Sequence, residues 1–301
     1  MIYDIIVIGA GPAGLTASIY GRRAEKKVLV LEENNYGGQI INTLDIENYP
    51  ANYHISGFDF ANNLYKQALD LKAEIKFEKV IEIRNKKIKE IITNKNRYLG
   101  KTIIIATGLT YRSLGIPNEK DLIGKGISFC ATCDGNFYKG KDVCVVGGGN
   151  TAVSDALYLS NIVNKVYIVH RREELRADLK DVLLLKNKKN VVFLLNSSII
   201  KINGNDHLES IDIKTKEGKN ISIKVSGLFV AIGHVPINDC FKNLLKLDNN
   251  GYVIAKENCH TNIKGVFVAG DIRTKEVRQL VTAVSDGAVA SLEAVKYLKN
   301  K

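Results

Sequence analysis

The chain has 301 residues, a length that predicts two domains, each large enough to bury its own hydrophobic core. Hydrophobic residues make up 45% and charged residues 25% of it, as in ordinary globular proteins, and no stretch reaches the about 20 apolar residues of a membrane span. Five cysteines are too few for a disulfide scaffold, and the absence of a signal-peptide pattern favours a cytoplasmic protein.

The formal net charge of +11 raises the question of a nucleic-acid partner. Lysine and asparagine are spread along the whole chain, as in residues 85–87 and 186–190, which is typical of solvated loops. No basic stripe interleaved with aromatic residues and no nucleic-acid-binding module is present. We therefore predict no nucleic-acid and no membrane partner, while the charge is compatible with an acidic protein partner.

The first predicted element is a buried parallel strand that ends in a glycine-rich loop. Residues 5–8 are continuously apolar, and Gly9, Gly11 and Gly14 follow with the spacing Gly-x-Gly-x-x-Gly, before the alanine-containing helix 15–20. The first glycine permits a tight turn, the second lets a pyrophosphate approach the backbone, and the third allows close helix packing. The loop thus predicts a dinucleotide site at a helix N-terminus.

A second strand, residues 28–31, ends in the acidic pair Glu32 and Glu33. An acidic side chain at this point of a strand–helix–strand unit accepts hydrogen bonds from ribose hydroxyls. The complete context makes the fingerprint much more specific than its glycines alone.

Two cysteines with the spacing Cys-x-x-Cys, Cys130 and Cys133, follow in the middle of the chain. Such a pair forms a readily reduced disulfide, or alternatively half of a zinc site. Structural zinc needs about four ligands, whereas Cys144, Cys240 and Cys259 are isolated in the sequence. The pattern favours redox chemistry and no metal, with Cys144 in an apolar strand and therefore in the core.

The strand–glycine–helix pattern then occurs a second time. The apolar strand 143–146 leads into residues 147–152, which read Gly-Gly-Gly-Asn-Thr-Ala, and an apolar helix continues through Leu159. This second fingerprint predicts a second dinucleotide site.

The strand of this second unit, residues 166–169, ends in basic residues instead of acidic ones. His170, Arg171 and Arg172 occupy the place that Glu32 has in the first unit, and Arg176 follows one turn later. Guanidinium groups bind a 2′-phosphate in a bidentate manner. The first site therefore suits a nucleotide with a free ribose and the second suits NADPH, with a solvated basic loop as the plainer alternative.

Several further motifs lie in a fixed order along nearly the whole chain, and together they give a specific resemblance. They are Gly37-Gly38-Gln39, Glu47-Asn48-Tyr49-Pro50, Ala106-Thr107-Gly108, Cys130-Ala131-Thr132-Cys133-Asp134-Gly135, residues 265–271 and Arg278-Gln279. With the two fingerprints, they make the chain similar to the low-molecular-weight bacterial thioredoxin reductases.

This resemblance implies an α/β fold of two Rossmann-like dinucleotide-binding domains, the second inserted into the first. The FAD domain is then discontinuous, at residues 1–111 and 242–301, and residues 112–241 form the NADPH domain with the redox cysteine pair. The family further implies tightly bound non-covalent FAD, NADPH as hydride donor, thioredoxin as substrate and a homodimer.

The resemblance also assigns cofactor contacts residue by residue. The FAD contacts are Gly9, Ala10, Gly11, Pro12, Ala13, Gly14, Glu32, Glu33, Gly38, Gln39, Asn48, Ala106, Thr107, Gly108, Asp271, Arg278 and Gln279. The NADPH contacts are Gly147, Gly149, Asn150, Thr151, His170, Arg171, Arg172 and Arg176. The pair Glu32-Glu33 is more acidic than is usual in the family, which affects the expected contacts of the adenosine.

In the mechanism that the resemblance implies, Cys133 faces the flavin and Cys130 attacks the disulfide of thioredoxin. Asp134 is expected to act as general acid, because a departing thiolate needs a proton donor within reach, although Asp-Gly is also a common turn pair. The inserted domain must bring both the disulfide and NADPH to one flavin. We therefore expect domain rotation with hinges near residues 109–114 and 233–238.

Two other functions remain open on the sequence alone. The same flavoprotein chemistry would serve another disulfide carrier, such as a peroxidase-linked or glutaredoxin-like protein. A nucleotide-binding redox sensor that signals through Cys130 and Cys133 without catalysis would also fit, since fold does not fix function.

Overall fold

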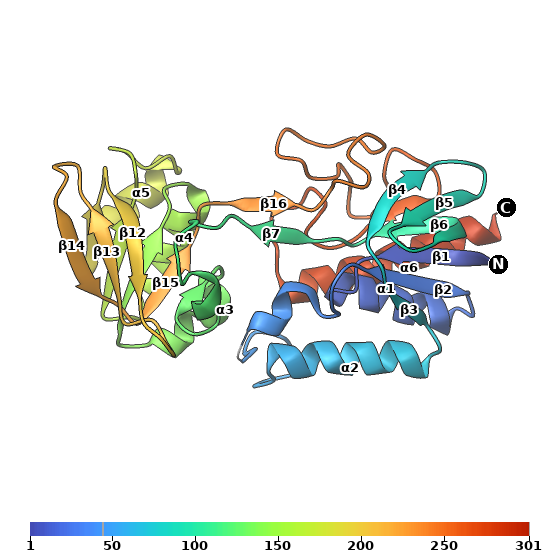
Figure 1. Ribbon diagram of the computed structural model, residues 1–301, viewed down its shortest axis with the longest axis horizontal. Helices are drawn as coiled ribbons and strands as arrows, with labels where there is room; N and C mark the ends of the chain where they lie inside the picture. Colours follow the sequence, from blue (N-terminus) through green and yellow to red (C-terminus); the bar gives the residue numbers. More distant parts are fainter. Residues whose placement is uncertain (44, 301) are drawn as a thin grey trace. The chain divides into compact units, whose positions relative to one another are not determined.

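The computed structural model describes residues 1–43 and 45–300, which form two compact units. Unit 1 combines Met1–Thr110 with Val235–Lys301, and unit 2 is the continuous stretch Tyr111–His234 (Figure 1). The sequence-based boundaries were placed at 111/112 and 241/242. Each unit has its own sheets and its own buried core.

Unit 1 is built on a mostly parallel sheet with the strand order β3-β2-β1-β6-β5-β4, and β17 pairs with the second half of β6. Strands β4 and β5 form an antiparallel hairpin that joins the first half of β6. The elements are β1 (Ile2–Ile8), α1 (Pro12–Arg23), β2 (Val28–Glu32), η1 (Gly38–Asn42), α2 (Gly57–Asp70), β3 (Glu74–Phe77), β4 (Val80–Arg84), β5 (Lys89–Thr93), β6 (Arg97–Ile105), β17 (Val266–Val268) and α6 (Leu280–Lys299).

Both faces of the central strands in unit 1 are covered, as expected for a continuously apolar parallel strand. Ile5 and Val7 of β1 pack with α1 and α6 on one face. Ile6 and Ile8 point to the other face, toward β5 and the segment that contains Phe241. The predicted elements at 5–8, 15–20 and 28–31 are thus confirmed as β1, α1 and β2.

Unit 2 has a parallel sheet with the order β11-β10-β9-β15-β8 and a separate antiparallel sheet β12-β13-β14. Its elements are η2 (Lys120–Leu122), β8 (Ile127–Ser128), α3 (Ala131–Asp134), η3 (Gly135–Tyr138), β9 (Asp142–Val146), α4 (Asn150–Leu159), β10 (Lys165–Val169), α5 (Leu179–Lys186), β11 (Val191–Leu194), β12 (Ser198–Asn203), β13 (Ser210–Lys214), β14 (Asn220–Lys224) and β15 (Gly227–Val230). The predicted strand, helix and strand after Cys133 are confirmed as β9, α4 and β10.

The parallel sheet of unit 2 is sandwiched between helices and the antiparallel sheet. Val143 and Val145 of β9 pack against α4, whereas Cys144 faces the side covered by β12 and β13. Cys144 is fully buried, and burial raises the pKa of its thiol, so it is a core residue as predicted. The two layers leave the carboxyl ends of β9 and β10 at one edge, where the second glycine loop lies.

The chain passes between the units twice, through β7 (Leu109–Tyr111) and β16 (His234–Pro236), which pair with each other. Backbone hydrogen bonds extend this pairing on both sides, from Arg112 N–H to the Gly233 carbonyl and from Ile237 N–H to the Gly108 carbonyl. The departing and returning segments therefore form one antiparallel ribbon, in the two regions where the hinges are predicted.

Candidate functional site

The first glycine loop lies between β1 and α1 in unit 1. Gly9 has a φ of 104°, and a Cβ there would lie 2.3 Å from the Ala106 carbonyl oxygen, so the loop touches the end of β6. A Cβ on Gly14 would lie 1.9 Å from the Gly9 carbonyl oxygen. A Cβ on Gly11 would meet only the Gly38 Cα at 3.9 Å. The first and third glycines are thus required by packing, and the second leaves open space beside the helix N-terminus.

The acidic residues after β2 have different surroundings. The Glu32 carboxylate accepts hydrogen bonds from the backbone N–H groups of Ala10, at 2.8 Å, and Asn34, at 3.0 Å. Glu32 thereby fixes the glycine loop, and a carboxylate has further lone pairs for a ribose hydroxyl. Glu33 is exposed and pairs with Lys79 at 2.6 Å.

Asp271 provides the clearest indication of a ligand in unit 1. It follows β17, and its Oδ1 atom is buried without a hydrogen-bond partner among residues 1–43 and 45–300. Burial raises the pKa of this carboxyl, against the opposing charges of Lys275 and Arg278. An unpartnered buried carboxyl oxygen is costly, and a ligand hydroxyl would satisfy it. This orphaned atom and the open space at Gly11 both fit the groups of a flavin dinucleotide.

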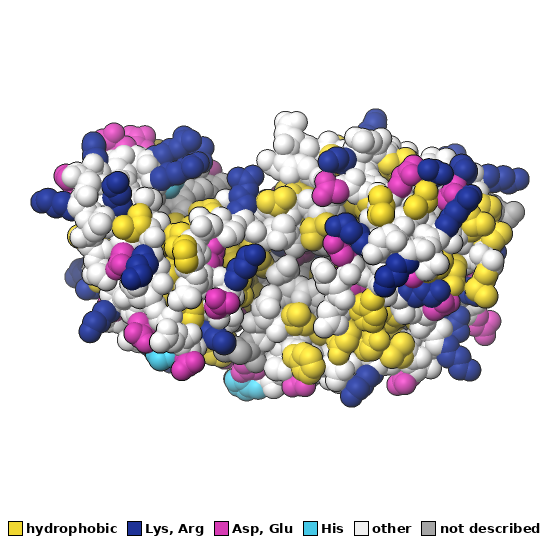
Figure 2. Space-filling view, in the orientation of Figure 1, with side chains coloured by type: hydrophobic (Ala, Val, Ile, Leu, Met, Phe, Trp, Pro, Cys, Tyr) yellow, Lys and Arg dark blue, Asp and Glu magenta, His cyan; other side chains and the backbone are white. Residues whose placement is uncertain are grey.

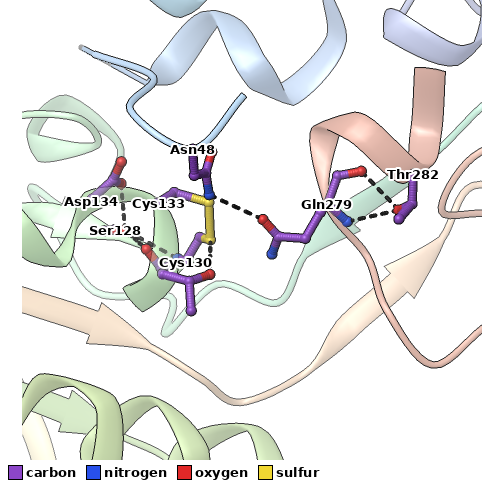
Figure 3. The surroundings of a disulfide bond; sticks show 8 residues. Asn48, Ser128, Cys130, Cys133, Asp134, Gln279 and Thr282 are labelled. Atoms are coloured by element: carbon purple, nitrogen blue, oxygen red, sulfur yellow. Dashed lines mark hydrogen bonds between the residues drawn. A yellow bond between two sulfur atoms is a disulfide. The ribbon is translucent and has the colours of Figure 1, made fainter. Parts of the chain in front are cut away.

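The other predicted flavin contacts of unit 1 are held by specific local bonds. The Asn48 amide donates to Gln279 Oε1 at 3.3 Å, and Gln279 is also the N-cap of α6 (Figure 3). The Arg278 guanidinium lies 4.3 Å from the centre of the Tyr252 ring. The Thr107 hydroxyl donates to the Ile237 carbonyl at 2.6 Å. The structure therefore brings Asn48 to the N-terminus of the last helix.

The cysteine pair forms a disulfide at the start of α3 in unit 2. Cys130 is the N-cap residue of this short helix, and the Cα atoms of Cys130 and Cys133 are 5.3 Å apart. Asp134 ends the helix. Its Oδ2 accepts the Ser128 hydroxyl at 2.6 Å, and its Oδ1 is buried and has no partner in the part of the chain that the structure describes. Burial raises the pKa of Asp134, and the Ser128 hydrogen bond opposes this effect. Ser128 is a site residue that the sequence did not reveal.

The second glycine loop, in unit 2, has the same two kinds of position as the first, one glycine required by packing and one beside open space. Gly147 has a φ of 151°, and its Cβ would lie 2.3 Å from the Ala231 carbonyl oxygen. Nothing lies within 4 Å of a Cβ on Gly149, so this loop also leaves open space at a helix N-terminus. The following helix begins at Asn150, where its N–H groups face that space. The local geometry fits a second pyrophosphate.

The basic segment after β10 folds back onto this loop. The Arg176 backbone N–H donates to the Gly148 carbonyl at 2.6 Å, and Arg176 forms a bridge with Gly149. Asn150 holds the end of the same segment against α4, because its Oδ1 accepts the Asp178 N–H at 2.9 Å. The sequence does not predict this contact of Asp178, because its partner Asn150 lies 28 residues earlier, at the start of α4 and before β10.

His170 and the three arginines have different exposures. The His170 ring is buried against Gly148, and its Nε2 atom has no hydrogen-bond partner within the described residues. Burial lowers the pKa of His170, and the neighbouring arginine charges lower it further, which favours the neutral imidazole. The side chains of Arg171, Arg172 and Arg176 are exposed and free to meet a phosphate. On the face shown in Figure 2, Lys and Arg side chains lie among acidic ones without forming one stripe.

Three side chains that could bind a metal approach one another in the loop before α2. Donor atoms of Asp45, Glu47 and His54 lie within 4.8 Å of one another among the residues that the structure describes. His54 Nδ1 is 2.6 Å from Asp45 Oδ2, which is an ordinary ion-pair contact on an exposed loop. We assign no metal to it.

Comparisons with known proteins identify the class. The model of the pyridine nucleotide-disulphide oxidoreductase family matches residues 3–287. The chain therefore belongs to this family. No described helix is long and apolar enough to cross a membrane.

Within the family, the chain is similar over nearly its whole length to several proteins named thioredoxin reductase. The chain is 43% identical to the thioredoxin reductase of Peptoclostridium acidaminophilum over 309 residues, with 99% of this chain and 98% of that protein covered. It is 39% identical to the thioredoxin reductase of Bacillus subtilis (strain 168), with 99% and 95% covered. The crystal structure of thioredoxin reductase from Streptococcus pyogenes MGAS5005 matches with a TM-score of 0.95 and 39% identity, covering 100% of this chain and 99% of that one. The predicted resemblance, fold class and oxidoreductase activity are confirmed.

Proposed function

We propose that this chain passes two electrons from NADPH through FAD and the Cys130–Cys133 disulfide to oxidised thioredoxin. The observation that carries the proposal is the disulfide at the N-terminus of α3, in the same unit as a glycine loop bordered by three exposed arginines. An electron donor and an electron-accepting disulfide are thereby assigned to a single folding unit.

FAD is assigned to unit 1. The Gly9–Gly14 loop would hold its pyrophosphate, Glu32 its ribose and Asp271 a hydroxyl or phosphate oxygen, which the open space at Gly11 and the orphaned Asp271 Oδ1 support. When bound, FAD accepts a hydride and passes the electron pair to a disulfide. The remaining predicted contacts, from Gly38 to Gln279, stay part of this proposal.

NADPH is assigned to unit 2, with the pyrophosphate at Gly149 and Asn150 and the 2′-phosphate at the exposed arginines. Three guanidinium groups around one phosphate discriminate NADPH from NADH because the latter has nothing for them to bind. The His170 ring packs against Gly148, and burial lowers its pKa, which supports a role in shaping the loop without adding charge.

The disulfide exchange requires both cysteines and one proton donor. After reduction, the Cys130 thiolate attacks one sulfur of the thioredoxin disulfide, that S–S bond breaks, and the leaving thiolate takes up a proton. The Cys133 thiolate then attacks the Cys130 sulfur of the mixed disulfide, which restores Cys130–Cys133 and releases the second thioredoxin thiolate. The raised pKa of Asp134 supports its role as general acid, because more of it is protonated near neutral pH.

We further propose a cytoplasmic homodimer whose inserted unit rotates between two orientations, since one flavin must meet both the disulfide and NADPH. The ribbon of β7 and β16 would carry this rotation. An engineered crosslink that fixes one orientation should abolish thioredoxin turnover and spare part of the flavin chemistry. Full turnover by the crosslinked protein would disprove the rotation.

The experiment that tests the function is an anaerobic titration of the flavin-loaded protein with NADPH and, separately, with NADH, followed by oxidised thioredoxin. We expect the flavin absorbance to bleach at far lower NADPH than NADH concentration and to recover when thioredoxin is added. Bleaching without recovery would reject thioredoxin in favour of another disulfide carrier. Recovery limited to a single turnover would favour a redox sensor, and no bleaching would reject the electron donor.

A further inference from the structure

The Ser128 hydroxyl lies between the two parts of the disulfide-exchange machinery in unit 2 (Figure 3). Its Oγ atom is 2.6 Å from Asp134 Oδ2 and accepts the Cys130 backbone N–H at 3.1 Å. A third contact, to the Cys130 carbonyl, is longer at 3.3 Å. One hydroxyl therefore bonds to both the general acid and the backbone of the attacking cysteine.

The position of Ser128 is fixed by the fold and not by the local loop. Ser128 lies in β8, where it is paired with Phe229 of β15, and its side chain is buried. Asp134 ends α3, and its N–H donates to the Cys130 carbonyl at 3.1 Å. The hydroxyl thus connects a sheet strand to a short helix of four residues that has little stability of its own.

The two carboxyl oxygens of Asp134 are not equivalent. Oδ2 accepts the Ser128 hydroxyl, whereas Oδ1 is buried with no partner among the described residues. A carboxylic acid whose one oxygen accepts a hydrogen bond carries its proton on the other oxygen. In the described part of the chain, no charged side chain pairs with Asp134. The titratable group beside it is Tyr138, whose phenol has a pKa raised to about 12 by burial and then by the Asp134 charge.

From this geometry we infer that Ser128 is a positioning residue of the disulfide exchange: it holds Asp134 through Oδ2 beside Cys130, so that the transferable proton resides on Oδ1. This inference rests on the proposed function of the same site. In the step concerned, the thiolate that leaves a breaking S–S bond takes the proton from Oδ1, and the carboxylate that forms keeps its hydrogen bond from Ser128.

The test is a double-mutant cycle in the full-length, FAD-loaded protein with thioredoxin as acceptor. We expect Ser128→Ala to lower kcat about tenfold or more, the effect of losing a hydrogen bond to a charged group. Asp134→Asn should lower kcat by about 100-fold to 10,000-fold, as expected for loss of a general acid. The double variant should be no slower than Asp134→Asn alone, because Ser128 acts through Asp134.

Two further variants separate this role from folding. Ser128→Thr retains the hydroxyl and should recover most of the lost kcat. Ser197→Ala removes another buried hydroxyl of unit 2, one that donates to the Leu195 carbonyl at 2.9 Å, and should leave kcat unchanged. The inference would be overturned if the fold-losses of kcat in the two single variants multiplied in the double variant. It would also be overturned if Ser128→Ala were as fast as the wild type.

A second measurement does not depend on thioredoxin. The Asp134 carboxyl is titrated by infrared difference spectroscopy, with Asp134→Asn as the blank. Loss of the Ser128 bond to the ionised carboxylate should raise the Asp134 pKa in Ser128→Ala, and an unchanged pKa would overturn the inference. If the wild type fails to reduce thioredoxin while this pKa shifts, the proposed function fails and the positioning role stands.

Discussion

Arg273 and Asp286 form a buried bidentate ion pair in unit 1, with Arg273 Nε 2.8 Å from Asp286 Oδ2 and Nη2 2.8 Å from Oδ1. Asp286 Oδ2 also accepts the Gly270 N–H at 3.0 Å and the Lys275 ammonium at 2.9 Å. The pair therefore fastens α6 to the turn that presents Asp271. The proposed flavin contact is held in place by a charge on the last helix.

Removing one partner of this pair should be costly. We expect Asp286→Ala to lower the free energy of unfolding by about 3–5 kcal/mol, because it leaves Arg273 buried and without its main counter-charge. Denaturant unfolding followed by circular dichroism measures the effect. The matched control is Glu293→Gln, at the more exposed pair with His260, which should cost under about 1 kcal/mol. Equal losses in the two variants would contradict the ranking.

The same carboxylate should make stability depend on pH. Burial opposes its ionisation, but the hydrogen bonds from Arg273 and Lys275 outweigh this and hold the folded-state pKa of Asp286 below its ordinary value. Its contribution is therefore fully present above the unfolded-state pKa and is lost as pH falls through the lower folded-state pKa. We expect urea midpoints to decline below about pH 5 in the wild type. In Asp286→Asn this decline should be shallower, and an identical slope would refute the assignment.

Alanine substitutions at Gly11 and Gly14 should have different effects, the first on flavin binding and the second on stability. Gly11→Ala places its methyl group in open space, so the protein should fold but purify with little flavin, because the pyrophosphate is displaced. Gly14→Ala places its methyl 1.9 Å from the Gly9 carbonyl oxygen and should destabilise unit 1 itself. Flavin absorbance per protein and the thermal midpoint of the flavin-free forms distinguish these outcomes. Full flavin content in Gly11→Ala would argue against a pyrophosphate at this position.

The exposed arginines should determine the choice of nucleotide. We expect Arg172→Ala and Arg176→Ala each to raise the KM for NADPH by about 10-fold to 100-fold, through loss of a charge-assisted hydrogen bond. The KM for NADH should stay unchanged. Lys219→Ala, at an exposed cation before β14, controls for a general loss of positive charge. Equal increases for both nucleotides would mean that the arginines do not bind the 2′-phosphate.

Much of this architecture could be predicted from the sequence because it depends on short-range patterns. Apolar runs predicted β1, β2, β9 and β10, with glycine loops after β1 and β9, and the Cys-x-x-Cys spacing predicted the disulfide that is present. The opposite charges after the strands, at Glu32 and at His170 to Arg172, predict a different nucleotide for each glycine loop. These signals lie within a few residues of the feature that they determine.

What the sequence did not reveal depends on contacts between distant segments. The Arg273–Asp286 pair, the hydrogen bond between Asn150 and Asp178 and the use of Glu32 to fix the Ala10 N–H all need the folded backbone. Ser128 is close to Asp134 in sequence, but a serine before a cysteine has many possible uses. Its proposed role depends on the fold, because β8 places the hydroxyl beside the Asp134 carboxyl.

The antiparallel ribbon of β7 and β16 has a consequence for how such a molecule could arise. The Gly108 carbonyl and the Ile237 N–H are hydrogen-bonded, so the chain leaves unit 1 and re-enters it at adjacent positions. A two-residue turn would close that gap and leave the strand order of unit 1 intact. The whole of unit 2 is thus an insertion at a single point of unit 1, and a different inserted unit would leave the strands of unit 1 unchanged.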